Sequence, residues 1–184
     1  MQHVRKKATN SIRNLNRVNH LLPLKHRKLL YNSLVASHYN YVDTVWSGCG
    51  KRNEKRLQLT QNFAARSMLG LRKHSSATDA LKELNFLPLK DKRIVHEAVY
   101  VHKALNNKLP SQVTEHYTDL KSKQNLRGAT TQTLNIPKHR TQQYQNSPIY
   151  RTIKSWNSTP KSFRTEENTN SFKIKLQTHL LTTI

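Results

Sequence analysis

Apolar side chains recur at helical spacing in three successive stretches of this chain, at about residues 3–20, 23–38 and 53–69. In the first stretch the apolar residues from Val4 to Val18 fall on one side of a helix with 3.6 residues per turn, and basic residues fall on the other. The second stretch opens at Pro23, which suits a first helical turn because its missing N–H costs nothing there. The pattern predicts three amphipathic helices, each with a side for a shared core and a basic side.

Shorter signals predict further helices downstream. Ser76 can accept a hydrogen bond from a backbone N–H and so cap a short helix that ends near residue 84. A longer helix opens at Leu87-Pro88-Leu89 and ends at Asn106-Asn107, and its many aliphatic residues favour a place in the core. Phe172 and Leu176, one helical turn apart, predict a last helix.

Two other stretches lack this periodicity. Between residues 118 and 146, Thr, Gln, Asn and Lys dominate, so we expect a long loop or partly extended connector, with disorder in isolation as an open alternative. Two glycines interrupt the chain at residues 47–50. We expect Tyr41 and Trp46, just before that break, to be core anchors, with a platform for stacking bases as the alternative.

These elements predict a mainly α fold, with an N-terminal helical bundle, a looser helical extension and a long irregular connector. We expect the bundle to span residues 1–72 and the helical extension residues 73–117. The polar connector then covers residues 118–147, and a C-terminal helical segment covers residues 148–184.

Charge indicates the partner. The chain has 32 Lys and Arg against 10 Asp and Glu, a net charge of +22, and only 35% apolar residues. Self-repulsion on this scale favours binding to a polyanion, so we expect nucleic acid (RNA, DNA or an RNA–DNA hybrid) as the partner; merely solvated basic faces are the alternative. The basic sides of the three helices supply the candidates for phosphate contacts: Lys6, Arg13, Arg17, Lys25, Arg27, Lys28, Lys55 and Arg66.

Several classes of protein are disfavoured. Cys49 is the only cysteine, so no internal disulfide can form, and a reducing compartment is expected, in the nucleus or the cytoplasm. No apolar run approaches the roughly 18 residues of a membrane span, and the N-terminus lacks the apolar stretch of a secretory signal. The ten histidines form no ligand-like array with Cys49, so no metal site is expected.

A catalytic centre is not expected either. Polymerases and nucleases that use two metal ions need clustered carboxylates, and only Glu166 and Glu167 are adjacent among the acidic residues. The chain also lacks a glycine-rich phosphate loop and a GxSxG elbow. We therefore predict no catalytic residues, no metal, no cofactor and no enzymatic activity.

A series of short motifs carries a family resemblance. The run from Leu29 to Val35, then Tyr39-Asn40-Tyr41 and Val45-Trp46, resembles the region downstream of the catalytic core in reverse transcriptases of non-LTR (LINE-type) retrotransposons, where LYxSLI…HLxYC…VWG is common. Further pieces match in the same order: Leu57, Gln61-Asn62, Ala64-Ala65-Arg66, Leu81, Leu84, Leu87-Pro88-Leu89, Arg93, Asn125-Leu126-Arg127, Pro137, Arg140-Thr141, Trp156-Asn157-Ser158, Pro160, Phe172-Lys173 and Leu176. Asp43, Phe63 and Thr159 depart from the family's pattern.

The resemblance implies that this chain is the thumb and the carboxy-terminal extension of such a polymerase, with the fingers, palm and endonuclease outside it. The thumb would grip template–primer through the phosphate backbone, and a separate fingers–palm core would be a partner. It also implies that Met1 is an internal methionine serving as a start. Two alternatives stay open: a protein-interaction segment that docks on a polymerase core, and a degenerate open reading frame without selected activity.

Overall fold

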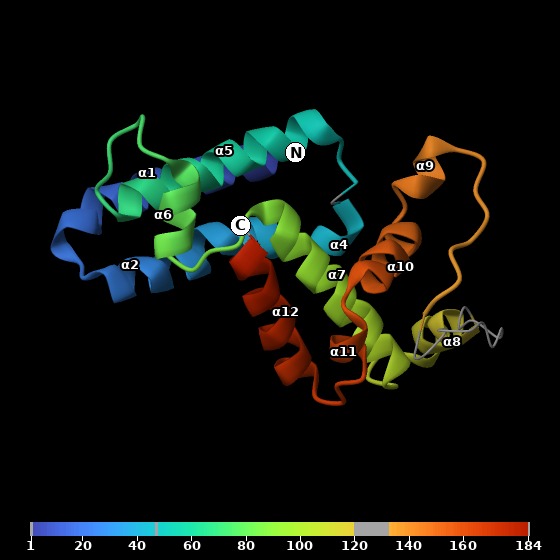
Figure 1. The fold of residues 1–184 in the computed structure, drawn as a ribbon. Coiled ribbons are helices and arrows are strands. Elements are labelled where there is room, and N and C mark those ends of the chain that lie inside the picture. Colours follow the sequence, from blue (N-terminus) through green and yellow to red (C-terminus); the bar gives the residue numbers. More distant parts are fainter. Residues whose placement is uncertain (1, 47, 120–132, 184) are drawn as a thin grey trace. The chain divides into compact units, whose positions relative to one another are not determined.

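The computed structural model describes residues 2–46, 48–119 and 133–183, which lie mostly in helices (Figure 1). The expected mainly α fold is confirmed. The described residues divide into two compact units. Unit 1 draws on Met1–Asp43 and Cys49–Asp91, and unit 2 on Thr44–Gly48 and Lys92–Thr182. The division expected at residues 72, 117 and 147 stays a prediction.

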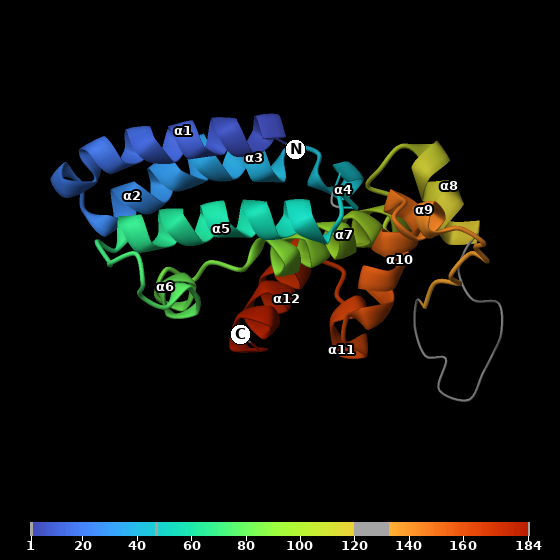
Figure 2. The same cartoon turned by 90° about the horizontal axis from the view of Figure 1, so that it is seen from above.

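Unit 1 contains the three expected amphipathic helices. The first is α1 (Gln2–Val18) and the third is α5 (Lys51–Met68). The second runs without a break in the backbone through α2 (Leu24–Leu30), the π-helical segment η2 (Tyr31–Ala36) and α3 (Ser37–Asn40). Figure 2 shows α1, the α2–α3 rod and α5 side by side. Their buried apolar residues form one core: Ala8, Ile12, Leu15, Tyr31, Val35, Ala36, Tyr39, Leu57, Ala64, Ala65 and Met68.

The ends of these helices follow local rules. A short 3-10 turn, η1 (Asn19–Leu21), follows α1, and Pro23 stands at the N-cap of α2 as expected. α5 ends at Met68, and Gly70, two residues later, has a φ of 68°, in the left-handed region that favours glycine just after a helix. After it, α6 (Ala77–Glu83) begins with the predicted cap, in which the Ser76 hydroxyl accepts a hydrogen bond from the backbone N–H of Asp79.

Unit 2 takes α7 (Leu89–Leu105) from Lys92 onward, and this helix starts after Pro88 and stops before Asn106-Asn107 as predicted. Its other elements are α4 (Asp43–Trp46), α8 (Ser111–Asp119), α9 (Gln142–Gln145), α10 (Pro148–Ser158), α11 (Lys161–Arg164) and α12 (Thr169–Thr183). The expectation that α7 is core is confirmed, because Val95, Ala98 and Val101 are fully buried. Trp156 of α10 and Phe172 of α12 complete this core, with ring centroids 5.8 Å apart.

The predicted connector is only partly described, since residues 120–132 lie outside the described residues. α8 runs to Asp119, past the expected start of the connector, and α9 lies within it. Residues 133–140 are irregular, as expected. Tyr41 corrects one expectation: its side chain is 79% exposed, so it is not a core anchor, because the chain leaves the bundle at this point. In the part of the chain that is described, no helix is both long and apolar enough to cross a bilayer.

Candidate nucleic-acid interface

α1 and α5 lie parallel in unit 1, because the starts and the ends of both helices meet. Gln2 and Asn53, near the two N-termini, line one crevice. Near the C-termini, the Asn19 side-chain amide donates a hydrogen bond to the backbone carbonyl of Ser67 at 3.2 Å. Each helix turns its apolar stripe towards the core, so the flanks beside these stripes face each other across the seam.

A groove of about 700 Å³ opens along this seam, on the outside of the bundle. α1 contributes a stripe of polar residues to the lining, and α5 contributes a stripe that includes two apolar residues. The α1 residues are Gln2, Arg5, Lys6, Thr9, Asn10 and Arg13, and the α5 residues are Arg56, Leu59, Thr60 and Phe63. The volume lies within the range of about 300–1,000 Å³ that is usual for sites of small ligands.

The groove carries positive charge alone. Four of its lining residues are Lys or Arg, and none is Asp or Glu. α1 itself contains Arg5, Lys6, Lys7, Arg13 and Arg17 and no acidic residue. Within the described residues, neither a hydrogen bond nor an ion pair ties the Arg5, Lys6 or Arg13 side chain to another group. These cations are therefore available to an anionic ligand.

The structure brings together two of the predicted phosphate contacts and separates the others from them. Lys6 and Arg13 line the groove. Arg17, Lys25 and Lys55 are exposed, and Lys28 is half-buried, but none of these four lines it. They can extend a positive surface on unit 1, but they do not share the groove.

Arg27 and Arg66 have internal partners. The Arg27 guanidinium donates to the carbonyls of Leu22 and Met68, both at 2.7 Å, and so holds the C-terminal end of α5. Arg66 Nε donates to the carbonyl of Ser75 at 2.8 Å, across the loop that follows α5. Each arginine uses guanidinium N–H donors for hydrogen bonds within the fold, so fewer of its donors are free to bind a phosphate.

Sequence reasoning missed Arg5 and Arg56. The predicted residues lie on the side of each helix opposite the core, whereas the groove also uses residues on the flanks where α1 and α5 meet. Two signals were present in the sequence: α1 has no acidic residue, and Arg56, Thr60 and Phe63 follow each other at helical spacing. Which flanks meet depends on the parallel pairing of α1 with α5, which no local pattern fixes.

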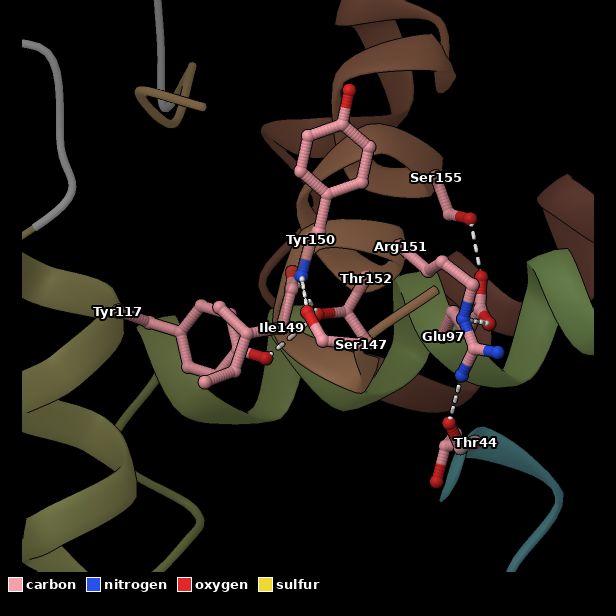
Figure 3. A network of polar contacts seen from close by, with 9 residues as sticks. All are labelled: Thr44, Glu97, Tyr117, Ser147, Ile149, Tyr150, Arg151, Thr152 and Ser155. Atoms are coloured by element: carbon pink, nitrogen blue, oxygen red, sulfur yellow. Dashed lines mark hydrogen bonds and ion pairs between the residues drawn. The ribbon is translucent and has the colours of Figure 1, made fainter. Parts of the chain in front are cut away.

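Unit 2 holds a buried polar network of a different kind, shown in Figure 3. Glu97 of α7 accepts a hydrogen bond from the Ser155 hydroxyl at 2.5 Å and faces Arg151 Nε at 3.6 Å. Arg151 Nη2 also donates to the carbonyl of Thr44. A buried carboxylate is costly unless it is paired and hydrogen-bonded, and here both conditions are met.

A second pair extends this network towards α8. The hydroxyls of Tyr117 and Thr152 lie 2.7 Å apart, and Thr152 in turn donates to the carbonyl of Ile149 at 2.9 Å (Figure 3). Burial raises the pKa of Tyr117, so this hydroxyl stays protonated at neutral pH. The network joins α4, α7, α8 and α10, which is a structural role. No group of three metal-ligating side chains occurs among the residues that the structure describes.

In comparisons with known proteins, no family model, no curated protein and no solved structure matches the chain.

Proposed function

We propose that the chain binds nucleic acid through the phosphate backbone, centred on the groove between α1 and α5. The observation that carries this proposal is the convergence of Arg5, Lys6, Arg13 and Arg56 on one open groove that no acidic residue lines. Bound phosphates would offset the repulsion among these cations, and release of counterions would supply much of the affinity. Such contacts position a nucleic acid without reading its sequence.

The wider proposal is that this is the thumb and following region of a non-LTR retrotransposon reverse transcriptase, without the catalytic carboxylates of the palm. The ordered motifs from Leu29 to Leu176 support it, together with the N-terminal helical bundle. In this role the chain holds template–primer for a catalytic core carried elsewhere and does not itself transfer nucleotides.

A salt titration tests the proposal. Binding of a short RNA–DNA hybrid is measured by fluorescence anisotropy at several salt concentrations. If about six cations engage phosphates, the logarithm of the affinity falls with the logarithm of salt at a slope of roughly −4 to −5. Replacing the four groove cations by Gln is expected to make this slope shallower by about 3.

A matched variant separates the groove from net charge. Lys82, Lys90, Lys103 and Lys154 are exposed and lie outside the groove, and replacing them by Gln removes the same charge. The proposal predicts a clearly smaller loss of affinity for this variant. Equal losses in both would move the interface away from the groove, and a flat response of the wild-type chain to salt would refute backbone binding altogether.

The protein-interaction alternative draws no support from α7. Its residues Val95, Ala98 and Val101 are fully buried within this chain, so they present no apolar face to a polymerase core. Association with a separately expressed fingers–palm fragment is the measurement that would revive that alternative.

A further inference from the structure

The groove between α1 and α5 is not purely polar. Leu59 and Phe63 line it from α5, and their side chains remain 56% and 46% exposed. We propose that this groove takes single-stranded nucleic acid, with a base stacked against Phe63 and the backbone held by the cations around it. The inference rests on the proposed function and goes further, because it names the form of nucleic acid and the residue that contacts the bases.

The helical register places the ring among the charges. Arg56, Leu59 or Thr60, and Phe63 follow at i, i+3 or i+4, and i+7, so they form one stripe along α5. Arg5 and Arg13 stand about 12 Å apart along α1, at a rise of 1.5 Å per residue. A short strand can therefore contact both arginines and the ring.

The exposed apolar surface favours a single strand over a duplex. In a duplex the flat face of each base is covered by its neighbours, and the surface offered to the groove is phosphate and sugar. Such a surface can pair with Arg5 or Arg56 but gains nothing from Phe63. An unpaired base has a free π face that an aromatic side chain can stack upon whatever the base, and arginine beside it adds a cation–π contribution.

An amphipathic peptide fits the same groove less well. A helix that docks in a groove inserts a row of apolar anchors into a continuous apolar floor. Here the apolar surface is confined to Leu59 and Phe63, and the remaining lining residues are polar or cationic. The charge complements a polyphosphate strand along the whole groove.

The test compares three probes of equal length: single-stranded oligothymidine, a DNA duplex, and an abasic strand that keeps the phosphates. Phe63→Ala is expected to weaken binding of oligothymidine roughly 5- to 100-fold, since stacking on one aromatic side chain has about that effect. The duplex and the abasic strand should lose less than twofold. Leu29→Ala, an exposed apolar residue of α2 outside the groove, is the matched control and should change none of the three.

A second variant gives a direct readout. Phe63→Trp places an indole in the groove, and oligothymidine should quench its fluorescence whereas the abasic strand should not. Equal weakening of all three probes by Phe63→Ala, or no quenching, overturns the inference while backbone binding stands. If the variant without the four groove cations loses binding of all three probes and Phe63→Ala does not, the proposed function is supported independently of Phe63. Tighter binding of an acidic amphipathic peptide than of oligothymidine also overturns the inference.

Discussion

Among single residues, the arginines of this chain fall into two groups by their partners. Arg27, Arg66 and Arg164 direct their guanidinium groups to backbone carbonyls at helix ends or in the adjoining loop, whereas Arg5 and Arg13 face an open groove. The planar guanidinium suits the first role because its donors form a fixed fork that can reach several carbonyls at once. Counting basic residues therefore overestimates the number of phosphate contacts, since some of the arginines form hydrogen bonds that stabilise the fold.

Arg164 gives a test of the structural group. It is buried, and it donates to the carbonyls of Asn157, in the last turn of α10, and of Thr159, the residue that follows that helix, at 2.5 and 2.7 Å. Arg164→Lys keeps the charge but loses the fork, and we expect the free energy of unfolding to fall by about 1.5–3 kcal/mol. Urea titration measures it. Arg140→Lys, at an exposed position, should change it by less than about 0.5 kcal/mol, and equal effects would refute the structural role.

His102 predicts how stability depends on pH. Its ring is buried, stacks on Phe172 at 4.6 Å, and lies 2.7 Å from the carbonyl of Glu166. Burial lowers its pKa below the ordinary value of 6.5, with Lys108 acting in the same direction and Glu166 against it. Below pH 6.5 the unfolded chain therefore takes up this proton more readily than the folded one, and unfolding becomes easier as pH falls.

The measurement is the urea midpoint at pH 7.5 and 5.5. The wild-type chain should lose more stability between these values than His102→Gln, which has no proton to bind at this position. His20→Gln, at an exposed position, should behave as the wild type. An identical pH dependence for the wild type and His102→Gln would show that this ring does not contribute.

At the scale of elements, local chemistry predicted much of the fold. The periodicity of the apolar residues located α1 and α5, and the Ser76 cap, Pro88 and Asn106-Asn107 located the ends of α6 and α7. These signals act within one or two helical turns, so they can be read from a single sequence.

Features that depend on distant partners were not predictable. The π-helical segment Tyr31–Ala36 contains neither glycine nor proline, and nothing in its sequence marks it. Glu97 and Arg151 form an ion pair although they are 54 residues apart in the sequence. The local sequence around Glu97 in α7 therefore could not identify its partner. The candidate site was half predictable for the same reason: Lys6 and Arg13 lie outward on α1, whereas Arg56 joins them only through the pairing of two helices.

The cap of α6 gives a prediction for a single element. Ser76→Ala removes the acceptor that satisfies the backbone N–H of Asp79, and it should cost about 1 kcal/mol of unfolding free energy. Thr78→Ala, inside the first turn and exposed, removes a hydroxyl without removing a cap and should be close to neutral. If Thr78→Ala costs as much as Ser76→Ala, the capping bond is not the cause.

For the whole molecule, a net charge of +22 works against a core built from only 35% apolar residues. Like charges repel across the folded surface, and the repulsion is weakened by salt, whose screening length is about 10 Å at 0.1 M. A bound polyanion removes the same repulsion at its own site. Stability and ligand binding should therefore respond to salt in opposite directions.

We expect the unfolding temperature of the free protein to rise as salt increases from low to physiological concentration, because screening relieves the folded state more than the expanded one. An oligonucleotide in excess adds RT ln(1 + [L]/Kd) to the free energy of unfolding, so the unfolding temperature at low salt should be higher than that of the free protein. As salt weakens binding, the difference between the two temperatures should disappear. Differential scanning fluorimetry across salt, with and without oligothymidine, measures both curves. The variant without the four groove cations should give nearly the same curve with and without oligothymidine, because the binding site is lost, and its unfolding temperature should rise less with salt than that of the free wild type, because it has less repulsion to relieve. If the wild-type unfolding temperature changes neither with salt nor with oligonucleotide, the basic residues are dispersed over solvated faces and do not form a nucleic-acid site.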